Sequence, residues 1–590
     1  VRDIGKALGL DPLFIDQLAK SLVWWDRRND LLQRFKGANL ANPELADRFL
    51  FLINEILGFP RHLSQHVGGF VICDGPISQL APVENASMAD RTVIQWDKED
   101  IEALGLLKVD ILGLGMLSAI RRCLELINQY HPQPLSLKTI PTEQPEPYQL
   151  LSAGDTIGVF QVESRAQMSM LPRLRPQNYY DLVIEVAIVR PGPIQGDMVH
   201  PYLRRRDGIE PVSYENDELK AVLARTLGIP IFQEQVIKLA MVAAGFSGGE
   251  ADQLRRAMAS WGRNGNLLTF REKLVNGMRQ RGYSQDFAER LFNQMKGFGS
   301  YGFPESHAAS FALLVYVSAW LKYHHAAAFY CALLNSQPMG FYSPSQLVQD
   351  ARRHQIELRP VDVAHSHWDC TLEETQQMPQ QQPALRLGLR LVKGFNTAAA
   401  QRLVAARRQQ SFLDIQDMCH RARLNQLERT ALVRANAMPG FAAHRHQAHW
   451  QNQAIEESRP LLEKKVASHS KSSPLNDGVQ LAAPSEAQDL LADYNSIGLT
   501  LNRHPMAILR RHPPFNQCRT AAALQQITHG RFVRIAGIVT GRQRPGTASG
   551  VIFLTLEDET GNLNVIIWRA LQERFRQALL TGKLLMIKGI

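Results

Sequence analysis

The run LLKVDILGLG holds the pair of charged residues best placed to do chemistry. Lys108 and Asp110 stand two positions apart among apolar residues. Successive side chains of a β-strand point to opposite faces, so a strand here puts both on one face. A carboxylate in that position suits Mg²⁺, which takes few oxygen ligands plus substrate phosphates, and the lysine can meet phosphate charge. The alternative is a structural aspartate in a turn or ion pair, as Asp362 between two valines suggests.

Two strands and a helix must position this pair. Apolar, β-branched stretches favour strands over 69–73 and 104–112, and a helix over 116–130 follows the second. Before them, residues 1–65 have apolar side chains at helical spacing. The sequence therefore predicts a small helical region followed by a strand-to-helix site.

The rest of the chain alternates helical stretches with breaks and ends in strands. Helical periodicity dominates 142–339 and returns over 385–441 after a glutamine-rich loop, whereas 442–486 is polar and is expected to be a flexible linker. Four strands with one helix before the last predict an OB-type barrel without its final strand. Those strands are expected at 531–541, 550–556, 563–568 and 584–589, with the helix at 570–580.

Bulk composition favours a multidomain protein with a polyanionic partner. A chain of 590 residues exceeds one core, and its net charge of +10 suits phosphate binding. The six cysteines show no paired spacing, which argues against zinc and disulfides and fits a reducing cytoplasm. The apolar run over 308–321 is shorter than the roughly 20 residues of a membrane span, so we expect a buried helix and no membrane association. Both ends look truncated, since the chain opens without Met and stops inside a strand-like run.

Several long motifs resemble those of bacterial C-family DNA polymerases, the family of the DNA polymerase III alpha subunit. KVDILGLGML resembles the strand that carries that family's third catalytic aspartate, which Asp110 matches. The resemblance continues in the family's order through SQHVGG, GVFQVESRAQM, VRPGPIQGDMV, FQEQV, ADQLRRAM and GSYGFPESHAASFALLVY. It covers most of the chain.

The resemblance implies a multidomain α+β fold and a two-ion Mg²⁺ site that is incomplete here. The family's first two carboxylates lie in an Asp-x-Asp motif upstream, and no such motif occurs in this chain. The chain alone is therefore expected to be inactive. Asp110 and Lys108 are the residues that it would contribute to the catalytic site. The implied domains are a helical thumb-like region (1–65), the remaining palm segment (66–115), helical fingers (116–380), a helix-hairpin-helix module (381–441), a linker (442–525) and an incomplete OB fold (526–590).

Arginines near glycine-rich corners are candidates to hold an incoming deoxynucleoside triphosphate. Arg255 and Arg256 follow a Gly-Gly pair, and guanidinium forks suit phosphates, although an exposed helix arginine is the plain alternative. The same expectation covers Arg165, Arg190, Gln161 and Ser164, with Arg165 and Arg190 preferred. A platform for a base or sugar is expected from Tyr301, Phe303 and His307, against the alternative of core packing at a helix start.

The segment LRLVKGFNTAAAQRLVAARR predicts a helix-hairpin-helix motif. Gly394 supplies the turn and Asn396 the N-cap, so backbone N–H groups can grip a DNA phosphate. The expected second copy over 424–441 lacks a comparable glycine turn, and a purely structural hairpin is the alternative. Basic residues that add DNA-binding charge are Lys393, Arg402, Arg407 and Arg408, and those of the OB module are Arg531, Arg534, Arg542 and Arg544.

Pro304 and Glu305 in GFPESHAASF resemble the error-prone branch of the family more than the main replicative alpha subunit. That branch implies primer-template DNA as partner, damage-induced mutagenesis and translesion synthesis, and sliding-clamp access through accessory mutagenesis proteins, because no clamp-binding peptide is found. The main replicative subunit remains one alternative, a non-catalytic DNA-binding scaffold a second, and a two-metal nuclease a weaker third.

Overall fold

The computed structural model divides into two compact units, Val1–Leu114 and Gly115–Ile590. The structure describes residues 1–21, 43–57, 59, 68–86, 88, 90–96, 98–111, 113–130, 132–189, 196–260, 267–296, 304–339, 342–374, 382–455, 481–544 and 551–590. No helix in those ranges is long and apolar enough to cross a membrane.

The first unit combines a helical cluster with two small antiparallel sheets. Helices α1, α2 and α4 share an apolar core around Phe49 and Ile53, so the helical spacing predicted for this region is found in the described residues of 1–57. Strand β1 pairs with β4, and β2 pairs with β3. The elements are α1 (Arg2–Ala7), α2 (Pro12–Ser21), α4 (Pro43–Ile56), β1 (Gly69–Ile72), β2 (Val83–Asn85), β3 (Thr92–Ile94), α5 (Lys98–Ala103) and β4 (Leu107–Asp110).

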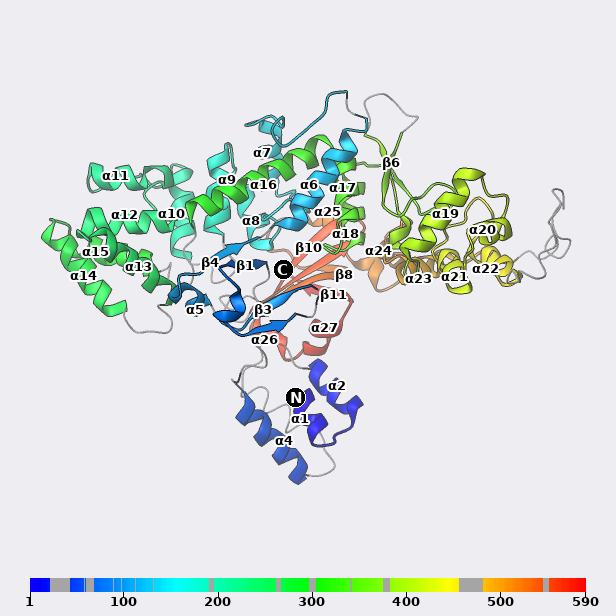
Figure 1. Ribbon diagram of the computed structural model, residues 1–590, viewed down its shortest axis with the longest axis horizontal. Helices are drawn as coiled ribbons and strands as arrows, with labels where there is room; N and C mark the ends of the chain where they lie inside the picture. The colour runs from blue at the N-terminus through cyan, green and yellow to red at the C-terminus, as the bar shows by residue number, and fades with distance from the viewer. Residues whose placement is uncertain are drawn as a thin grey trace. The chain divides into compact units, whose positions relative to one another are not determined.

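The second unit is organised around α16, whose 20 residues include the predicted apolar run over 308–321. The helix packs against α7 and α9 (Figure 1), and its residues 315–322 are all buried, whereas Leu313 and Tyr323 are exposed. The helices of this region are α6 (Leu114–Ile127), α7 (Pro145–Ser152), α8 (Arg165–Leu174), α9 (Tyr179–Ile188), α10 (Gly196–Arg206), α16 (Glu305–His324), α17 (Ala326–Asn335) and α18 (Pro344–Arg353). The expectation of a buried helix is confirmed for residues 315–321.

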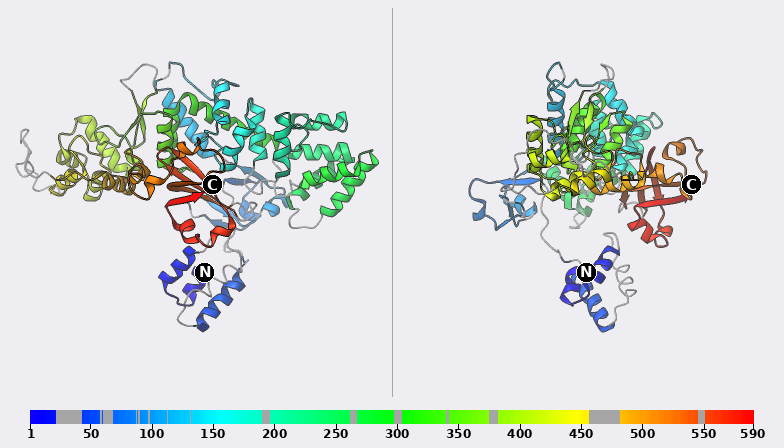
Figure 2. Two further views of the ribbon diagram at one scale, coloured as in Figure 1. Left: turned by 180° about the vertical axis from the view of Figure 1, so that it is seen from behind. Right: turned by 90° about the vertical axis from the view of Figure 1, so that its right-hand side faces the viewer.

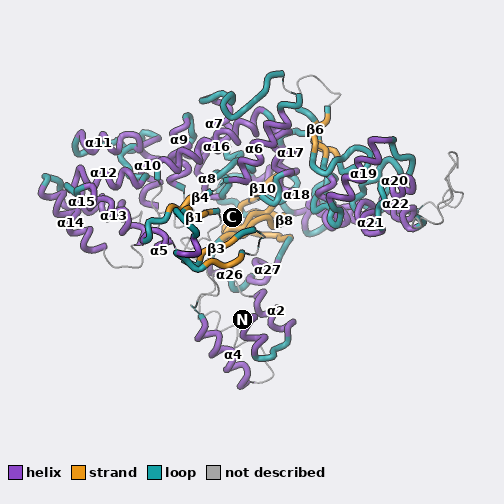
Figure 3. Tube along the Cα trace, in the orientation of Figure 1, coloured by secondary structure: helices purple, strands orange, loops and turns teal. Residues whose placement is uncertain are grey.

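Five helices of the second unit form a separate core between α10 and α16 in the chain. Val236, Ala240 and Met278 lie at its centre and are almost wholly inaccessible. The helices are α11 (Asp217–Leu223), α12 (Gln233–Ala244), α13 (Gly248–Ser260), α14 (Leu267–Gln280) and α15 (Gln285–Lys296). Figure 3 shows how strongly helix dominates this part of the chain.

The main core continues from the α16 region into the helix-hairpin-helix module. One cluster of buried side chains runs from Met116 through Leu321 and Leu403 to Leu499, so the two regions are not separate packing units. A three-stranded sheet of order β5-β7-β6 lies between them in sequence. The elements are β5 (Leu358–Arg359), β6 (Thr371–Glu373), β7 (Ala384–Arg386), α19 (Thr397–Gln409), α20 (Ile415–Arg421) and α21 (Gln426–Arg434).

The described part of 442–525, expected as a linker, is largely helical and packed. Arg445 is buried, and its guanidinium bonds Asp489 at 2.7 Å and Asp493 at 2.5 Å. These ion pairs join the two helices on either side of residues 456–480. They hold the helices together where the sequence offers few apolar side chains. The helices are α22 (Arg445–Gln453), α23 (Glu486–Ser496), α24 (Pro505–Leu509) and α25 (Ala521–Leu524). The linker expectation was wrong for these residues.

The C-terminal module is a four-stranded antiparallel sheet of order β10-β9-β8-β11. All four predicted strands and the predicted helical stretch are present, and Figure 2 shows them together in red. They are β8 (Val533–Gln543), β9 (Ile552–Asp558), β10 (Gly561–Ile567), α26 (Arg569–Gln572), α27 (Arg576–Thr581) and β11 (Leu584–Gly589). Among the described residues this sheet is open, with β10 and β11 as its edges, so a closed barrel is not observed.

Candidate functional site

Strand β4 places the predicted catalytic pair at the end of a two-stranded sheet. Asp110 is the last residue of β4 and lies opposite Gly69, and Lys108 lies opposite Val71. The backbone thus projects residues 108 and 110 to one face, as the sequence predicted. Lys108 is partly buried, whereas the side chain of Asp110 lies outside the described residues. The metal role of Asp110 stays a prediction.

Three of the predicted nucleotide contacts lie at or just before the start of α8. Ser164 is the N-cap, and its hydroxyl accepts a hydrogen bond from the Gln167 amide at 3.3 Å, while Gln167 accepts one from the Ser164 amide. Gln161 has a left-handed backbone, with φ of 64°. Arg165 begins the helix, although its side chain is not described. Capping explains Ser164 without a ligand, and the nucleotide role of all three stays a prediction.

The other predicted nucleotide contacts are only partly covered by the structure. Arg190, Tyr301 and Phe303 lie outside the described residues, and of Arg255 and Arg256 only the helical backbone in α13 is described. His307 lies in the first turn of α16, with its ring centroid 4.3 Å from that of Phe311. Ring packing is the alternative that the sequence left open for His307, and its role in binding stays a prediction.

Glu305, one of the two branch-distinguishing residues, connects α16 to two neighbouring segments. Its carboxylate accepts hydrogen bonds from the Tyr180 hydroxyl at 2.9 Å and from Arg225 at 3.3 Å. Its amide donates to the Glu234 carboxylate at 3.0 Å. The Arg225 guanidinium also lies 3.9 Å from the centre of the Tyr180 ring. Glu305 therefore fixes the start of α16, close in sequence to the predicted nucleoside platform.

Lys322 forms a buried ionic centre that sequence reasoning did not single out. Its ammonium is fully buried and donates to the carboxylates of Asp155 at 2.7 Å and Asp350 at 3.0 Å, and to the carbonyl of Ile157 at 3.1 Å. His354 lies 2.7 Å from the other Asp155 oxygen. Asp155, Asp350 and His354 form the group of possible metal ligands in the described ranges. The ammonium already supplies the positive charge among them, so these residues do not fit a cation site.

The contacts around Lys322 lower the pKa of Asp155 and raise the pKa of His354. Burial opposes ionisation of Asp155, but the His354 hydrogen bond and the Lys322 charge outweigh it and hold the Asp155 pKa well below its ordinary value. Burial likewise opposes the charged form of His354, and the Asp155 hydrogen bond overcomes it, so the His354 pKa is raised. The centre is a fixed ion-pair network that joins α16 and α18 to the loop before α8.

The predicted helix-hairpin-helix turn is present at Gly394. This glycine has a φ of 83°, and the Asn396 side chain caps α19 by accepting from the Ala399 amide at 2.8 Å. The Lys393 ammonium donates to the carbonyls of Tyr494 and Asn495 at 3.0 and 3.1 Å. The turn therefore has the backbone geometry that a phosphate clamp needs, while its lysine is used to hold α23.

A second turn of the same form occurs at Arg423, which has a φ of 49°. Leu424 follows as a buried residue, and Asn425 caps α21 by accepting from the Glu428 amide at 2.9 Å. The order of left-handed residue, buried apolar residue and asparagine cap repeats that of Gly394 to Asn396. The second copy expected over 424–441 is therefore present, and arginine takes the left-handed position at which the sequence offered no glycine.

One buried carboxylate, that of Glu428, joins the two turns. It accepts from the Asn396 amide group at 3.2 Å, from Arg402 at 3.1 and 2.9 Å, and from the Asn425 backbone at 3.0 Å. Arg407 in turn donates to the carbonyls of Val363 and Ser366. Arg402 and Arg407 thus stabilise the module from within, whereas Arg408 is exposed. DNA contact by these arginines stays a prediction.

The predicted arginines of the C-terminal module also include one that is bonded inside the module and two that are exposed. The Arg542 guanidinium donates to the carbonyl of Leu579 at 2.7 Å and also to that of Gly582, so it ties β8 to the end of α27. Burial lowers the Arg542 pKa. Arg534 is exposed and contacts the Gln517 side chain, and Arg531 is exposed at the start of β8. DNA contact by Arg531, Arg534 and Arg542 stays a prediction.

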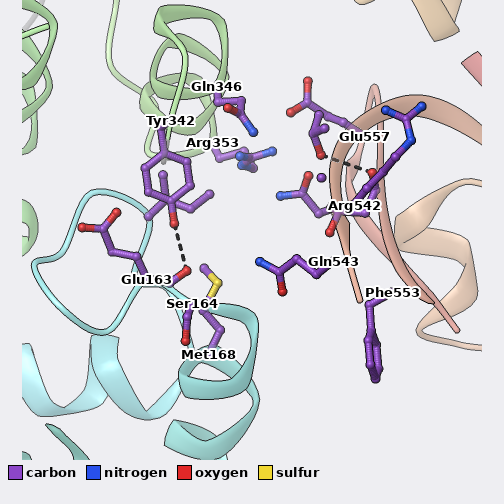
Figure 4. Close-up of a pocket in the computed structure, with 15 residues that line it drawn as sticks. Glu163, Ser164, Met168, Tyr342, Gln346, Arg353, Arg542, Gln543, Phe553 and Glu557 are labelled. Carbon is purple, nitrogen blue, oxygen red and sulfur yellow. Dashed lines mark hydrogen bonds between the residues drawn. The ribbon is translucent and has the colours of Figure 1, made fainter. Parts of the chain in front are cut away.

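A pocket lies between the start of α8, α18 and the sheet of the C-terminal module (Figure 4). Glu163, Arg353 and Gln346 line one side, and Gln543 and Phe553 line the other. Burial raises the Glu163 pKa to about 8, against the opposing Lys322 charge. The carboxyl group is thus mostly neutral at neutral pH and can donate a hydrogen bond.

Four domain models match the chain in sequence order. The Bacterial DNA polymerase III alpha NTPase domain matches residues 1–113, and the Bacterial DNA polymerase III alpha subunit finger domain matches 116–282. A Helix-hairpin-helix motif matches 355–448, and an OB-fold nucleic acid binding domain matches 533–590. The chain belongs to the bacterial C family of DNA polymerases, the family of the DNA polymerase III alpha subunit.

Within this family the chain is similar to proteins named Error-prone DNA polymerase. That of Teredinibacter turnerae is 60% identical over 590 residues, which are 100% of this chain and 56% of the relative. Those of Saccharophagus degradans and Pseudomonas fluorescens (strain Pf0-1) are 58% and 55% identical, each over 100% of this chain and 57% of the relative. The chain thus spans 56–57% of the length of these curated relatives. The sequence-based assignment to the error-prone branch is confirmed.

Proposed function

We propose that the protein acts as a DNA-directed DNA polymerase of the error-prone type. It would add deoxynucleotides to a primer 3′ end by two-metal phosphoryl transfer, in damage-induced mutagenesis and translesion synthesis. The observation that carries the proposal is the end-to-end identity, up to 60%, with relatives named Error-prone DNA polymerase. The preserved strand β4 with Lys108 and Asp110 supports it.

Asp110 is the residue that we assign to a Mg²⁺ ion, and Lys108 the residue that meets phosphate or the primer end. A carboxylate at the end of a strand is the type of oxygen donor that Mg²⁺ takes. When bound, the ions supply positive charge to the transferring phosphoryl group. A single carboxylate from this chain leaves the set of protein ligands short, because the sequence contains no Asp-x-Asp pair. We therefore propose that the chain alone does not extend primers.

The incoming nucleotide would be held by residues of the α8 to α16 region. Arg165 and Arg190 are the preferred phosphate contacts, because a guanidinium can bind two phosphate oxygens at once. The further assigned residues are Gln161, Ser164, Arg255, Arg256, Tyr301, Phe303 and His307. Arg255 and Arg256 are assigned on the same ground, and they follow the Gly248-Gly249 start of α13 in sequence.

The two C-terminal modules would hold primer-template DNA. Their matches to a helix-hairpin-helix motif and to an OB-fold nucleic acid binding domain support this role. In the first module the assigned contacts are Lys393, Gly394, Asn396, Arg402, Arg407 and Arg408, with the N–H groups beside the Gly394 turn on the phosphates. We further propose that the open sheet is part of an OB barrel, that sliding-clamp access comes through accessory proteins and that the protein works in the cytoplasm.

Mg²⁺-dependent primer extension tests this function. The chain is compared with an N-terminally extended version that restores an Asp-x-Asp segment, each with and without Asp110→Ala. We expect extension only from the longer form, and its loss by at least about 1,000-fold on removal of a metal ligand, which corresponds to about 4 kcal/mol. Asp362→Ala is the control, because Asp362, like Asp110, lies between two β-branched apolar residues and carries no catalytic assignment.

The competing function is a non-catalytic DNA-binding scaffold. It is favoured by the retention of both nucleic-acid-binding modules in a chain with one assigned carboxylate. A longer form that binds primer-template but adds no nucleotide would establish the scaffold instead.

A further inference from the structure

The segment between β10 and β11 exposes large apolar side chains that belong to neither of the apolar clusters found among the described residues of this module. Trp568 is 64% exposed, Phe575 48% and Leu571 43%. The core of the sheet is built from other residues, among them Ile535, Leu556 and Leu563. Exposed aromatics that gather on one short segment mark a contact surface more often than scattered ones do.

Backbone hydrogen bonds place the three residues at helical spacing, with Trp568 as the N-cap of α26. The Leu571 amide donates to the Trp568 carbonyl at 3.0 Å, and the Phe575 amide donates to the Leu571 carbonyl at 3.1 Å. Residues three and four apart in such helical turns are neighbours on the surface. The aromatic rings therefore flank Leu571 along the outside of α26 and the turn that leads to α27.

Arginines surround this face. Arg569 and Arg574 are exposed, and the Arg574 guanidinium carbon lies 5.2 Å from the centre of the Phe575 ring. Arg576 is paired with Glu573, the one acidic residue of the run WRALQERFR, at 3.8 Å. The surface is thus both aromatic and cationic, a combination that suits unpaired bases and phosphates together.

The position of α27 is set by an arginine of the sheet. Arg542 donates to the carbonyls of Leu579 and Gly582, at the end of this helix. Its hydrogen-bonding capacity is therefore partly used inside the module, whereas Arg569 and Arg574 extend from its surface. Arg531 and Arg534 are exposed as well, so it is the exposed aromatic rings next to Arg569 and Arg574 that favour the helix pair as the binding surface.

We propose that Trp568, Arg569, Leu571, Arg574 and Phe575 form a binding surface for single-stranded DNA. Bases stack on the two aromatic rings, and the exposed arginines meet the phosphates. Duplex DNA hides its base faces and uses only the arginines. The proposal rests on the nucleic-acid-binding role proposed for this module, and it does not depend on polymerase activity.

Fluorescence anisotropy of a labelled thymidine 20-mer tests the proposal with the full chain. Stacking contributes about 1–3 kcal/mol per base, so Trp568→Ala with Phe575→Ala is expected to weaken binding at least tenfold. Arg569→Ala with Arg574→Ala is expected to reduce the salt dependence of log K by about 1.4, for two single-strand phosphates. Trp450→Ala is the matched control, because Trp450 is an exposed tryptophan of α22.

Two outcomes overturn the proposal. In the first, the double aromatic variant binds the 20-mer as tightly as the parent chain. In the second, Arg531→Ala with Phe532→Ala removes most of the affinity, which places the strand on the β8 side. If the double aromatic variant loses binding to another protein but keeps its affinity for the 20-mer, the first outcome also applies. Primer extension by the N-terminally extended form, measured with the same variants, separates this result from a failure of the polymerase proposal.

Discussion

The helix-hairpin-helix module and the α26–α27 helix pair both carry arginines, yet they use them differently. In the first, Arg402 bonds the buried Glu428, and Arg407 bonds the carbonyls of Val363 and Ser366. In the second, Arg569 and Arg574 are exposed beside exposed aromatic rings. The same residue type stabilises the fold in one module and remains available to a ligand in the other.

This difference shows that the number of basic residues in a sequence does not give the number of nucleic-acid contacts. Within the helix-hairpin-helix module the groups left for DNA are mainly backbone N–H groups, which are set by the Gly394 and Arg423 turns. Within the C-terminal module they are side chains. Substitutions should therefore change stability in the first region and DNA affinity in the second.

The largest expected effect comes from Lys322, a fully buried charge that the fold uses. Lys322→Met leaves the buried Asp350 carboxylate without its ammonium partner, so we expect unfolding to become easier by about 3–5 kcal/mol. The urea-unfolding midpoint of the chain measures it. Lys138→Met, at an exposed position, is the control and should change stability by less than about 0.5 kcal/mol. Equal urea-unfolding midpoints for the two variants would show that Lys322 does not stabilise the fold.

A smaller loss is expected from Glu428→Gln. The substitution removes the charge that holds Arg402 and weakens the link between the two turns, at a cost of about 2 kcal/mol because Arg402 is partly exposed and can rehydrate. The thermal midpoint and the affinity for a blunt duplex should both fall. Glu573→Gln, on the exposed helix pair, should leave the thermal midpoint unchanged. If both variants unfold alike, the contrast between the two regions fails.

The smallest expected effect concerns pH and Glu163, in the pocket beside the C-terminal sheet. Burial raises its pKa from 4.5 to about 8, so the folded state binds this proton more tightly than the unfolded state does. Its stabilising contribution is complete below pH 4.5 and is lost as the pH rises through about 8. Glu163→Gln should reduce the loss of stability between neutral and alkaline pH by about 1 kcal/mol. Parallel pH profiles for the parent and the variant would contradict this assignment.

Local patterns predicted the elements well. The apolar run over 308–321 became α16, and the alternating stretch over 584–589 became β11 with the same bounds. Strand β4 presents Lys108 and Asp110 as expected, because the two-residue period of a strand is a local property.

Long-range partners could not be predicted. Lys322 stands at the end of an apolar run, and its partner Asp155 lies 167 residues away, so nothing local marks it as a buried ion. Arg423 takes a turn position that usually indicates glycine. Arg445 finds Asp489 and Asp493 in a segment whose polar composition resembled that of a linker. Trp568 ends a predicted strand and Phe575 lies within a predicted helix, and neither local pattern shows that the two rings are exposed.

The continuous core of the second unit also limits where this chain can be recombined with its relatives. Buried side chains from Met116 to Leu499 form one cluster that runs through the α16 region and the helix-hairpin-helix module. A crossover at residue 355, where the helix-hairpin-helix match begins, would join part of this core to part of a relative's core. The buried side chains of the two parts would then not pack together. A crossover at 114/115, between the two compact units, keeps that cluster whole. Chimaeras made by gene shuffling should therefore survive selection for folding at the second boundary and be lost at the first.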